Sequence, residues 1–277
     1  MILPGRSCTI APVTDEQQTN EFDHPVLAQI YDVAEGRRED LDHYAAIAEE
    51  LGARCVVDIG CGTGVLAILL AGRGYAVTGV DPAGAMLDVA RAKVGAERVR
   101  WVHGTAEDLR ELVQDAASVG GQETGRGGGQ RSGLPADLAV MTGNVAQVFL
   151  TDEEWLGTLR AVHDTLTPGG HLVFETRVPE RRAWEEWAGR GSSTYQVKGV
   201  GEVRDTFELV RVDEPYVTFS SDNTMPDGAV VPSESTLIFR SMPELERTLT
   251  EAGFSVREVR DAPDRPGREW VVLAQRP

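Results

Sequence analysis

The sequence has little cysteine and no long apolar run. Its three cysteines, Cys8, Cys55 and Cys61, are too few and too scattered for a disulfide framework or a zinc site, so we expect reduced, packed thiols and no bound metal. No apolar run approaches the roughly 18 residues that a membrane-spanning helix needs, and the polar residues 1–20 do not resemble a signal peptide. These absences exclude a membrane partner and favour a cytoplasmic location.

Positive charge is also scarce. The sequence has 27 Lys and Arg residues and 44 Asp and Glu residues, which gives a formal net charge of −17. Contacts to phosphate backbones are made largely by clustered Lys and Arg, so this balance argues against a nucleic-acid partner and leaves a small molecule as the expected one. The 277 residues are enough to bury a full core as one large domain or two small ones. A monomer and a homodimer both remain open.

One stretch, residues 55–65 (CVVDIGCGTGV), combines an apolar run with three alternating glycines. Val56, Val57 and Ile59 suit a strand that is buried on both faces, and the apolar residues 65–70 suit a helix that packs on a sheet. The glycines between them can adopt backbone dihedrals closed to other residues and let a ligand approach the backbone. The stretch therefore predicts a strand, a tight ligand-binding turn and a helix.

The spacing of these glycines separates two kinds of nucleotide ligand. The dinucleotide fingerprint G-x-G-x-x-G would need its third glycine where this chain has Val65, and here that glycine comes one residue earlier, at Gly64. Asp58 stands just before the turn, where it would repel a pyrophosphate and would suit a cationic amino group. A nicotinamide dehydrogenase is therefore disfavoured.

Residues 58–64 (DIGCGTG) resemble the first motif of class I S-adenosylmethionine-dependent methyltransferases, whose glycine turn cradles the aminoacyl end of the cofactor. Asp81 ends the next buried strand at about the spacing expected of a carboxylate that binds ribose hydroxyls. Residues 102–109 (VHGTAEDL) resemble the family segment that brackets adenine. The resemblance implies S-adenosyl-L-methionine as cofactor, bound by Tyr31, Asp58, Gly60, Cys61, Gly62, Thr63, Gly64, Asp81, Pro82, Met86, Thr105, Ala106, Glu107 and Asn144.

The same resemblance implies the fold. We expect an α/β fold with a Rossmann-like seven-stranded sheet in the order 3-2-1-4-5-7-6, with helices on both faces and the last strand antiparallel. Alternating β and α patterns support this over roughly residues 56–275. The expected strands are 54–58, 76–81, 98–103, 136–141, 171–176, 254–259 and 270–274, and the helices between them include 84–93, one that starts near 151 and stops at 168–170, 181–187 and 243–252.

Four segments lie outside the alternating β and α pattern, and two of them, a loop and an inserted meander, depart from the family plan. Residues 1–21 lack periodicity and predict a mobile arm before a methyltransferase domain at 22–277, and 114–135 predict a Gly-rich disordered loop. Short β runs in 195–240 predict an inserted antiparallel β meander. The resemblance implies that this insert caps the substrate, although a dimer surface would leave the same pattern. Apolar periodicity in residues 22–52 predicts two amphipathic helices around Gly36. The resemblance implies that such helices form a lid over the cofactor, with Tyr31, Arg37, His43 and Tyr44 as candidates to face the cleft.

The acceptor site is less clearly marked than the cofactor site. Asn144 and Gln147 follow strand 136–141, where ligands of open α/β sheets bind, so either amide could orient an acceptor. The family's enzymes for nucleic-acid amino groups carry an Asn/Asp-Pro-Pro-aromatic run there, which this chain lacks. If a general base is needed, Glu175 and His43 are the candidates. We expect methyl transfer to an O, N or C atom of a small molecule; a non-catalytic S-adenosylmethionine-binding subunit and a protein or RNA methyltransferase are the alternatives.

Overall fold

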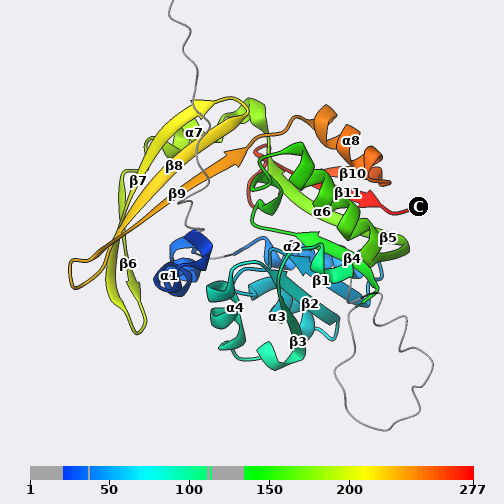
Figure 1. The fold of residues 1–277 in the computed structure, drawn as a ribbon, viewed down its shortest axis with the longest axis horizontal. Coiled ribbons are helices and arrows are strands. Elements are labelled where there is room, and N and C mark those ends of the chain that lie inside the picture. The colour runs from blue at the N-terminus through cyan, green and yellow to red at the C-terminus, as the bar shows by residue number, and fades with distance from the viewer. Residues whose placement is uncertain (1–20, 37, 111–112, 114–133) are drawn as a thin grey trace, which may run out of the picture.

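The computed structural model describes residues 21–36, 38–110, 113 and 134–277 (Figure 1). The predicted arm at 1–21, the lid candidate Arg37 and the Gly-rich loop at 114–135 lie wholly or largely outside these residues. The described chain forms a seven-stranded sheet covered by helices and a separate four-stranded sheet.

The seven-stranded sheet has the order β10-β11-β5-β4-β1-β2-β3. Strand β1 pairs in parallel with β2 and β4, whereas β11 runs antiparallel to both β5 and β10. This confirms the Rossmann-like sheet, its predicted order and its reversed last strand. The strands are β1 (Cys55–Ile59), β2 (Ala76–Asp81), β3 (Val99–His103), β4 (Ala136–Met141), β5 (Leu166–Arg177), β10 (Ser255–Asp261) and β11 (Glu269–Gln275).

Helices cover both faces of this sheet, as predicted. Consecutive residues of a strand point to opposite faces, and Val56 and Val57 of β1 accordingly belong to different apolar cores. Val57 packs in the core that includes α6 and α8, and Val56 in the core that includes α2 and α3. The helices are α2 (Leu41–Glu50), α3 (Val65–Gly72), α4 (Gly84–Arg91), α6 (Asp152–Thr165), α7 (Ala183–Trp187) and α8 (Met242–Glu251); short 3-10 turns are η1 (Glu21–Asp23), η2 (Ala96–Arg98), η3 (Val145–Gln147) and η4 (Pro179–Arg181).

Helix α6 begins as expected but ends earlier than expected. Thr151 and Glu154 form a reciprocal capping box at its start. We expected the helix to include Leu166 and to stop at the Pro-Gly-Gly run 168–170, but Leu166 is extended and pairs with Ala136 of β4. Pairing with a distant strand thus outweighs the local helical pattern, and β5 passes through the Pro-Gly-Gly run.

The predicted antiparallel meander is confirmed as a four-stranded sheet. Its strands are β6 (Ser192–Val197), β7 (Gly201–Asp213), β8 (Tyr216–Thr224) and β9 (Val230–Ile238), each antiparallel to its neighbour. Helix α1 (Pro25–Glu35) lies between this sheet and the seven-stranded sheet (Figure 1). Ile30 of α1 packs with Val197, Val203 and Met225, so an apolar contact joins α1 to the insert.

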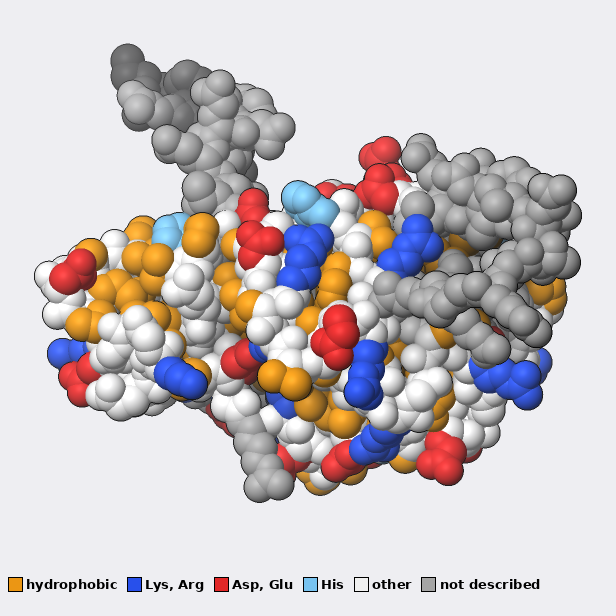
Figure 2. Space-filling view, turned by 90° about the horizontal axis from the view of Figure 1, so that it is seen from below, with side chains coloured by type: hydrophobic (Ala, Val, Ile, Leu, Met, Phe, Trp, Pro, Cys, Tyr) orange, Lys and Arg blue, Asp and Glu red, His pale blue; other side chains and the backbone are white. Residues whose placement is uncertain are grey.

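The surface carries charges of both signs. On the face drawn in Figure 2, acidic and basic side chains are interspersed rather than gathered by sign. Within the described residues, no helix is both long enough and apolar enough to cross a membrane.

Candidate functional site

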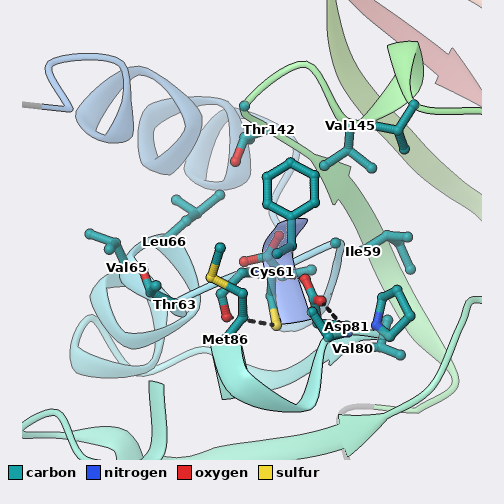
Figure 3. Close-up of a pocket in the computed structure, with 18 of the residues that line it drawn as sticks. Ile59, Cys61, Thr63, Val65, Leu66, Val80, Asp81, Met86, Thr142 and Val145 are labelled. Carbon is teal, nitrogen blue, oxygen red and sulfur yellow. Dashed lines mark hydrogen bonds between the residues drawn. The ribbon is translucent and has the colours of Figure 1, made fainter. Parts of the chain in front are cut away.

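A cavity lies at the carboxyl ends of β1, β2 and β4, and we call it the strand-end cavity. Its volume is about 850 Å³. Figure 3 shows the side chains of Asp81 and Met86 on one side of it and those of Thr142 and Val145 on the other. Every residue that the sequence predicted to bind cofactor lines this cavity except Gly64 and Asn144: Tyr31, Asp58, Gly60, Cys61, Gly62, Thr63, Asp81, Pro82, Met86, Thr105, Ala106 and Glu107.

Gly62 and Gly64 have different roles in the turn. Gly62 has φ +53°, and a Cβ built on it would meet no atom within 4 Å, so its open side faces space that a ligand can enter. Gly64 has φ +74° and precedes the first turn of α3; a Cβ there would overlap the ring of Trp101. Gly64 therefore shapes the turn by close packing, which explains its absence from the cavity wall.

Asp58 ends β1 as a buried acid. Its exposed fraction is 2%, and its carboxylate accepts a hydrogen bond from the backbone N–H of Ala67 in the first turn of α3. Burial, opposed by the charge of Arg38 and assisted by that of Asp81, raises its pKa to about 7. A cationic group bound in the cavity would favour the ionised form, so Asp58 suits a ligand amine.

Asp81 ends β2 beside it. Its Oδ2 accepts from Gly62 N at 2.7 Å and its Oδ1 from Ala83 N at 2.8 Å. Burial raises the pKa of this carboxyl, while the two backbone donors act in the opposite direction. A carboxylate oxygen can accept more than one hydrogen bond, so each oxygen has capacity left for one of two vicinal hydroxyls.

The third strand end forms another wall of the strand-end cavity. After β3, Thr105 N donates to Asp108 Oδ2 at 2.7 Å and thereby fixes a tight turn. Ala106 is buried, and Glu107 is exposed and lines the cavity. Asp58, Asp81 and this turn therefore bring two carboxyl groups and a stretch of backbone to one cavity.

Helix α1 is fastened over the glycine turn. Asp32 of α1 accepts a hydrogen bond from the Thr63 hydroxyl and forms an ion pair with Lys93 at 2.5 Å. Lys93 Nζ also donates to the Thr63 carbonyl at 2.8 Å. These contacts hold α1, and with it Tyr31, at the strand-end cavity.

A second cavity of about 460 Å³, which we call the insert cavity, lies between α1 and the four-stranded sheet. Side chains of a strand alternate between its faces, so strand pairing sets rows of residues on this wall. Ser193, Asp205 and Asn223 form one row across β6, β7 and β8. The next row is Phe207, Ser221 and Ser233 on β7, β8 and β9, and the opposite wall from α1 contains Leu27, Ile30, Tyr31, Ala34 and Glu35.

The two cavities adjoin each other. They share the residues Phe22, Tyr31, Glu35, Met86, Gly143 and Val148 as lining. Ligands in the two cavities would therefore meet along this shared wall.

Of the four predicted catalytic residues, the structure brings only Asn144 to a cavity wall. Asn144 lines the insert cavity and has a left-handed backbone, with φ 61°. Its Nδ2 donates to Glu269 at 3.2 Å, and its buried Oδ1 has no hydrogen-bond partner. It does not line the strand-end cavity, so its predicted contact with the cofactor is not seen there.

Glu175 is buried beneath the turn that follows β4. Its Oε1 accepts from Gly143 N at 2.5 Å and Asn144 N at 3.2 Å, and its Oε2 accepts from the Tyr44 hydroxyl. Burial and the nearby Glu269 raise its pKa. Glu175 therefore holds the turn after β4 in place from below and does not face the ligand space; Tyr44, a lid candidate, belongs to the core instead.

Gln147 and His43 also lie away from both cavities. Gln147 is 1% exposed and bridges Arg177, at 2.9 Å, to the Ile238 carbonyl, at 3.0 Å. His43 packs edge-on against Tyr44, and burial, followed by the charge of Arg260, lowers its pKa. Position after a strand or on a lid helix did not indicate which way these side chains point.

The sequence reasoning missed several residues that line the cavities. Asp32 and Glu35 follow Tyr31 on α1, where acidic residues look like an ordinary solvated helix face. Asp205 and Asn223 carry a signal that could have found them, because they occupy inward positions of the alternating pattern in the meander. The remaining missed wall includes Phe22, Arg38, Thr142, Gly143, Val148 and Phe149.

Comparisons with known proteins agree with this fold. The CcbJ methyltransferase from Streptomyces caelestis is 21% identical with a TM-score of 0.66, covering 94% of this chain and 99% of that one. S-Adenosylmethionine-bound CalS10, an amino pentose methyltransferase from Micromonospora echinaspora, is 21% identical with a TM-score of 0.64, covering 90% and 97%. At these identities the likeness shows the fold.

Curated relatives match over shorter stretches. The ubiquinone biosynthesis O-methyltransferase of Alkalilimnicola ehrlichii is 37% identical over 95 residues, which cover 29% of this chain and 38% of the relative. The chain spans less than half the length of the first curated relatives that it matches. A family model described as a methyltransferase domain matches residues 33–259, well over half of the chain. The chain therefore belongs to the methyltransferase domain family.

Proposed function

We propose that the protein transfers a methyl group from S-adenosylmethionine, bound in the strand-end cavity, to a small molecule bound in the insert cavity. The observation that carries this proposal is the wall shared by the two cavities, which includes Tyr31 and Glu35 of α1 and Gly143 and Val148 after β4. A donor and an acceptor would meet there without either leaving its own site.

The assignment of the cofactor rests on chemical fit. Asp58 suits the methionine amine and Asp81 the ribose diol, while the turn at Thr105 and Ala106 suits the adenine ring. The open side of Gly62 leaves room for the ligand to approach the backbone. The bound cofactor would supply a methyl group attached to a positively charged sulfur. On transfer, the sulfur would keep the electron pair of the broken S–C bond.

The chain's own part is to align the acceptor and exclude water. Correct positioning of two reactants can account for ~7–11 kcal/mol of a barrier. Glu175 contributes indirectly, because its bonds to Gly143 N and Asn144 N fix the shared wall. If the acceptor must lose a proton, Glu35 is the carboxylate that lines both cavities and could receive it.

The test is methyl transfer to a panel of small alcohols, phenols, amines and amino sugars, read as S-adenosylhomocysteine release. CalS10 is described as an amino pentose methyltransferase, which is the reason for including amino sugars. In a Val148→Trp variant, the larger side chain should occupy space where the two cavities adjoin. Cofactor binding should remain, and the rate of methyl transfer should fall by roughly tenfold or more. Val94→Trp is the control, because Val94 is 99% exposed. Cofactor binding with no acceptor-dependent release for any compound would contradict the proposal and favour a non-catalytic binding subunit.

A further inference from the structure

The floor of the insert cavity contains a carboxylate without a matching cation. Asp205, on β7, has a buried Oδ1 with no hydrogen-bond partner. Tyr195 lines the same cavity, and burial, followed by the charge of Asp205, raises its pKa to about 12. Among the residues that the structure describes, no Lys, Arg or His forms an ion pair with Asp205.

A buried carboxylate oxygen with no donor costs free energy unless a ligand supplies one. The other charged groups on this cavity do not meet that need. Arg177 is already neutralised, since it pairs with Glu269 at 3.5 Å, donates to Gln147 and stacks over the Trp187 ring at 5.0 Å. Arg190 is exposed, and Glu35 adds a second negative charge to the lining.

The rest of the wall is both polar and apolar. Ser193, Ser221, Ser233 and Asn223 present hydroxyl and amide groups beside Asp205. Phe207 and Phe219 stack 5.4 Å apart on the same wall, and Leu27 and Ile30 of α1 lie opposite. Such a wall suits a ring with hydroxyls at its edge and C–H groups on its faces.

We propose that the acceptor is a sugar-sized, polyhydroxylated amine and that the carboxylate of Asp205 binds its ammonium group. This inference rests on the proposed function. The serine and asparagine side chains bind the hydroxyls, and the aromatic pair contacts the ring face. The protein's net charge of −17 also favours the approach of a cation.

The test uses the protein loaded with S-adenosylhomocysteine and ligand-observed saturation-transfer NMR at pH 7. The probes are D-glucosamine, D-galactosamine and D-mannosamine, their neutral parent sugars, and D-glucuronic acid. At least one amine should bind roughly tenfold or more tightly than its neutral parent. Asp205→Asn should weaken that binding roughly 10- to 100-fold, because it removes a charge-assisted bond.

The matched control is Asp222→Asn, which makes the same charge change on the exposed face of the same sheet and should leave amine binding unchanged. Equal binding of amines and parents, tighter binding of the acid, no binding of any amine, or an unchanged amine affinity in Asp205→Asn would each overturn the proposal. Calorimetry of S-adenosylhomocysteine on the same samples separates the two claims. If that ligand binds and no amine does, only this inference fails; if it does not bind, the proposed function fails too.

Discussion

The strand-end cavity and the insert cavity are built in different ways. The first is formed at the ends of parallel strands, where Gly62 leaves space and the backbone groups of Gly62 and Ala83 hold Asp81. The second is formed by side chains on one face of a sheet, closed by a helix from the other end of the chain. The shape of the first cavity therefore depends on backbone geometry, and the shape of the second depends on side chains.

This difference predicts how each cavity responds to substitution. Changes at the strand-end cavity should alter folding and cofactor binding together, because the same atoms serve both. Changes on the inner face of the four-stranded sheet should alter acceptor binding alone. Substitutions of Asp58 and Asp32 on the wall of the strand-end cavity, and of Gly64 in the turn behind it, examine the first half of this contrast, and Asp205→Asn examines the second.

The largest effect is expected at Gly64. Gly64→Ala would place a Cβ against the Trp101 ring in a backbone conformation that disfavours it. Backbone strain and overpacking should together lower the free energy of unfolding by about 3 kcal/mol or more. Urea unfolding measures this. The control is Gly72→Ala in α3, where a Cβ meets nothing within 4 Å and should raise stability by about 0.5–1 kcal/mol. Equal effects at the two sites would show that the turn is not closely packed.

The next effect is expected at Asp58 and has opposite signs for stability and binding. Because burial raises its pKa to about 7, the folded protein favours the protonated form, and this group costs stability progressively as the pH rises from about 4 to about 7. Asp58→Asn should therefore raise the unfolding free energy of the ligand-free protein at pH 8 by about 2–4 kcal/mol, yet weaken cofactor binding. A less stable Asn variant would refute the assignment.

The pH dependence of binding provides a second readout for the same residue. If the ligand amine binds the ionised carboxylate, wild-type affinity for S-adenosylmethionine should fall as the pH drops below about 7. Asp58→Asn should lose this component of the pH dependence. Calorimetry between pH 6 and 8 compares the two proteins.

The smallest effect is expected at Asp32. Asp32→Ala removes the hydrogen bond from Thr63 and the ion pair with Lys93, so α1 should close less firmly over the turn. Cofactor dissociation should become about threefold to tenfold faster, in line with ~1 kcal/mol for a partly exposed ion pair. Stopped-flow fluorescence measures the rate. Asp42→Ala, which breaks the exposed pair with Arg73, is the control and should leave the rate unchanged.

The sequence predicted the strand-end cavity well because its determinants are local. Asp58, Gly62 and Asp81 each stand at a strand end whose position follows from the chain on either side. The predicted order of the seven strands was likewise correct, because the sequence resembles a family whose strand order is known. Local patterns could not predict that Leu166 leaves α6 to pair with Ala136, because that contact joins distant parts of the chain.

Depth and side-chain direction were the other limits. Glu175 was correctly expected near the end of β5, but its burial under the turn after β4 depends on Tyr44 and Gly143, which only the tertiary structure brings together. Asp205 was missed for a related reason. Its partners Ser193 and Asn223 come from other strands, so a polar floor exists only after the strands pair.

The most direct test of the account is calorimetry of S-adenosylmethionine and S-adenosylhomocysteine, with NAD as control, on the wild type and on Asp81→Ala. We predict that the first two bind the wild type, that NAD does not, and that the substitution weakens binding roughly 10- to 100-fold through the lost ribose contacts. Failure of both ligands to bind the wild type, or an affinity unchanged by Asp81→Ala, would contradict the assignment of the strand-end cavity.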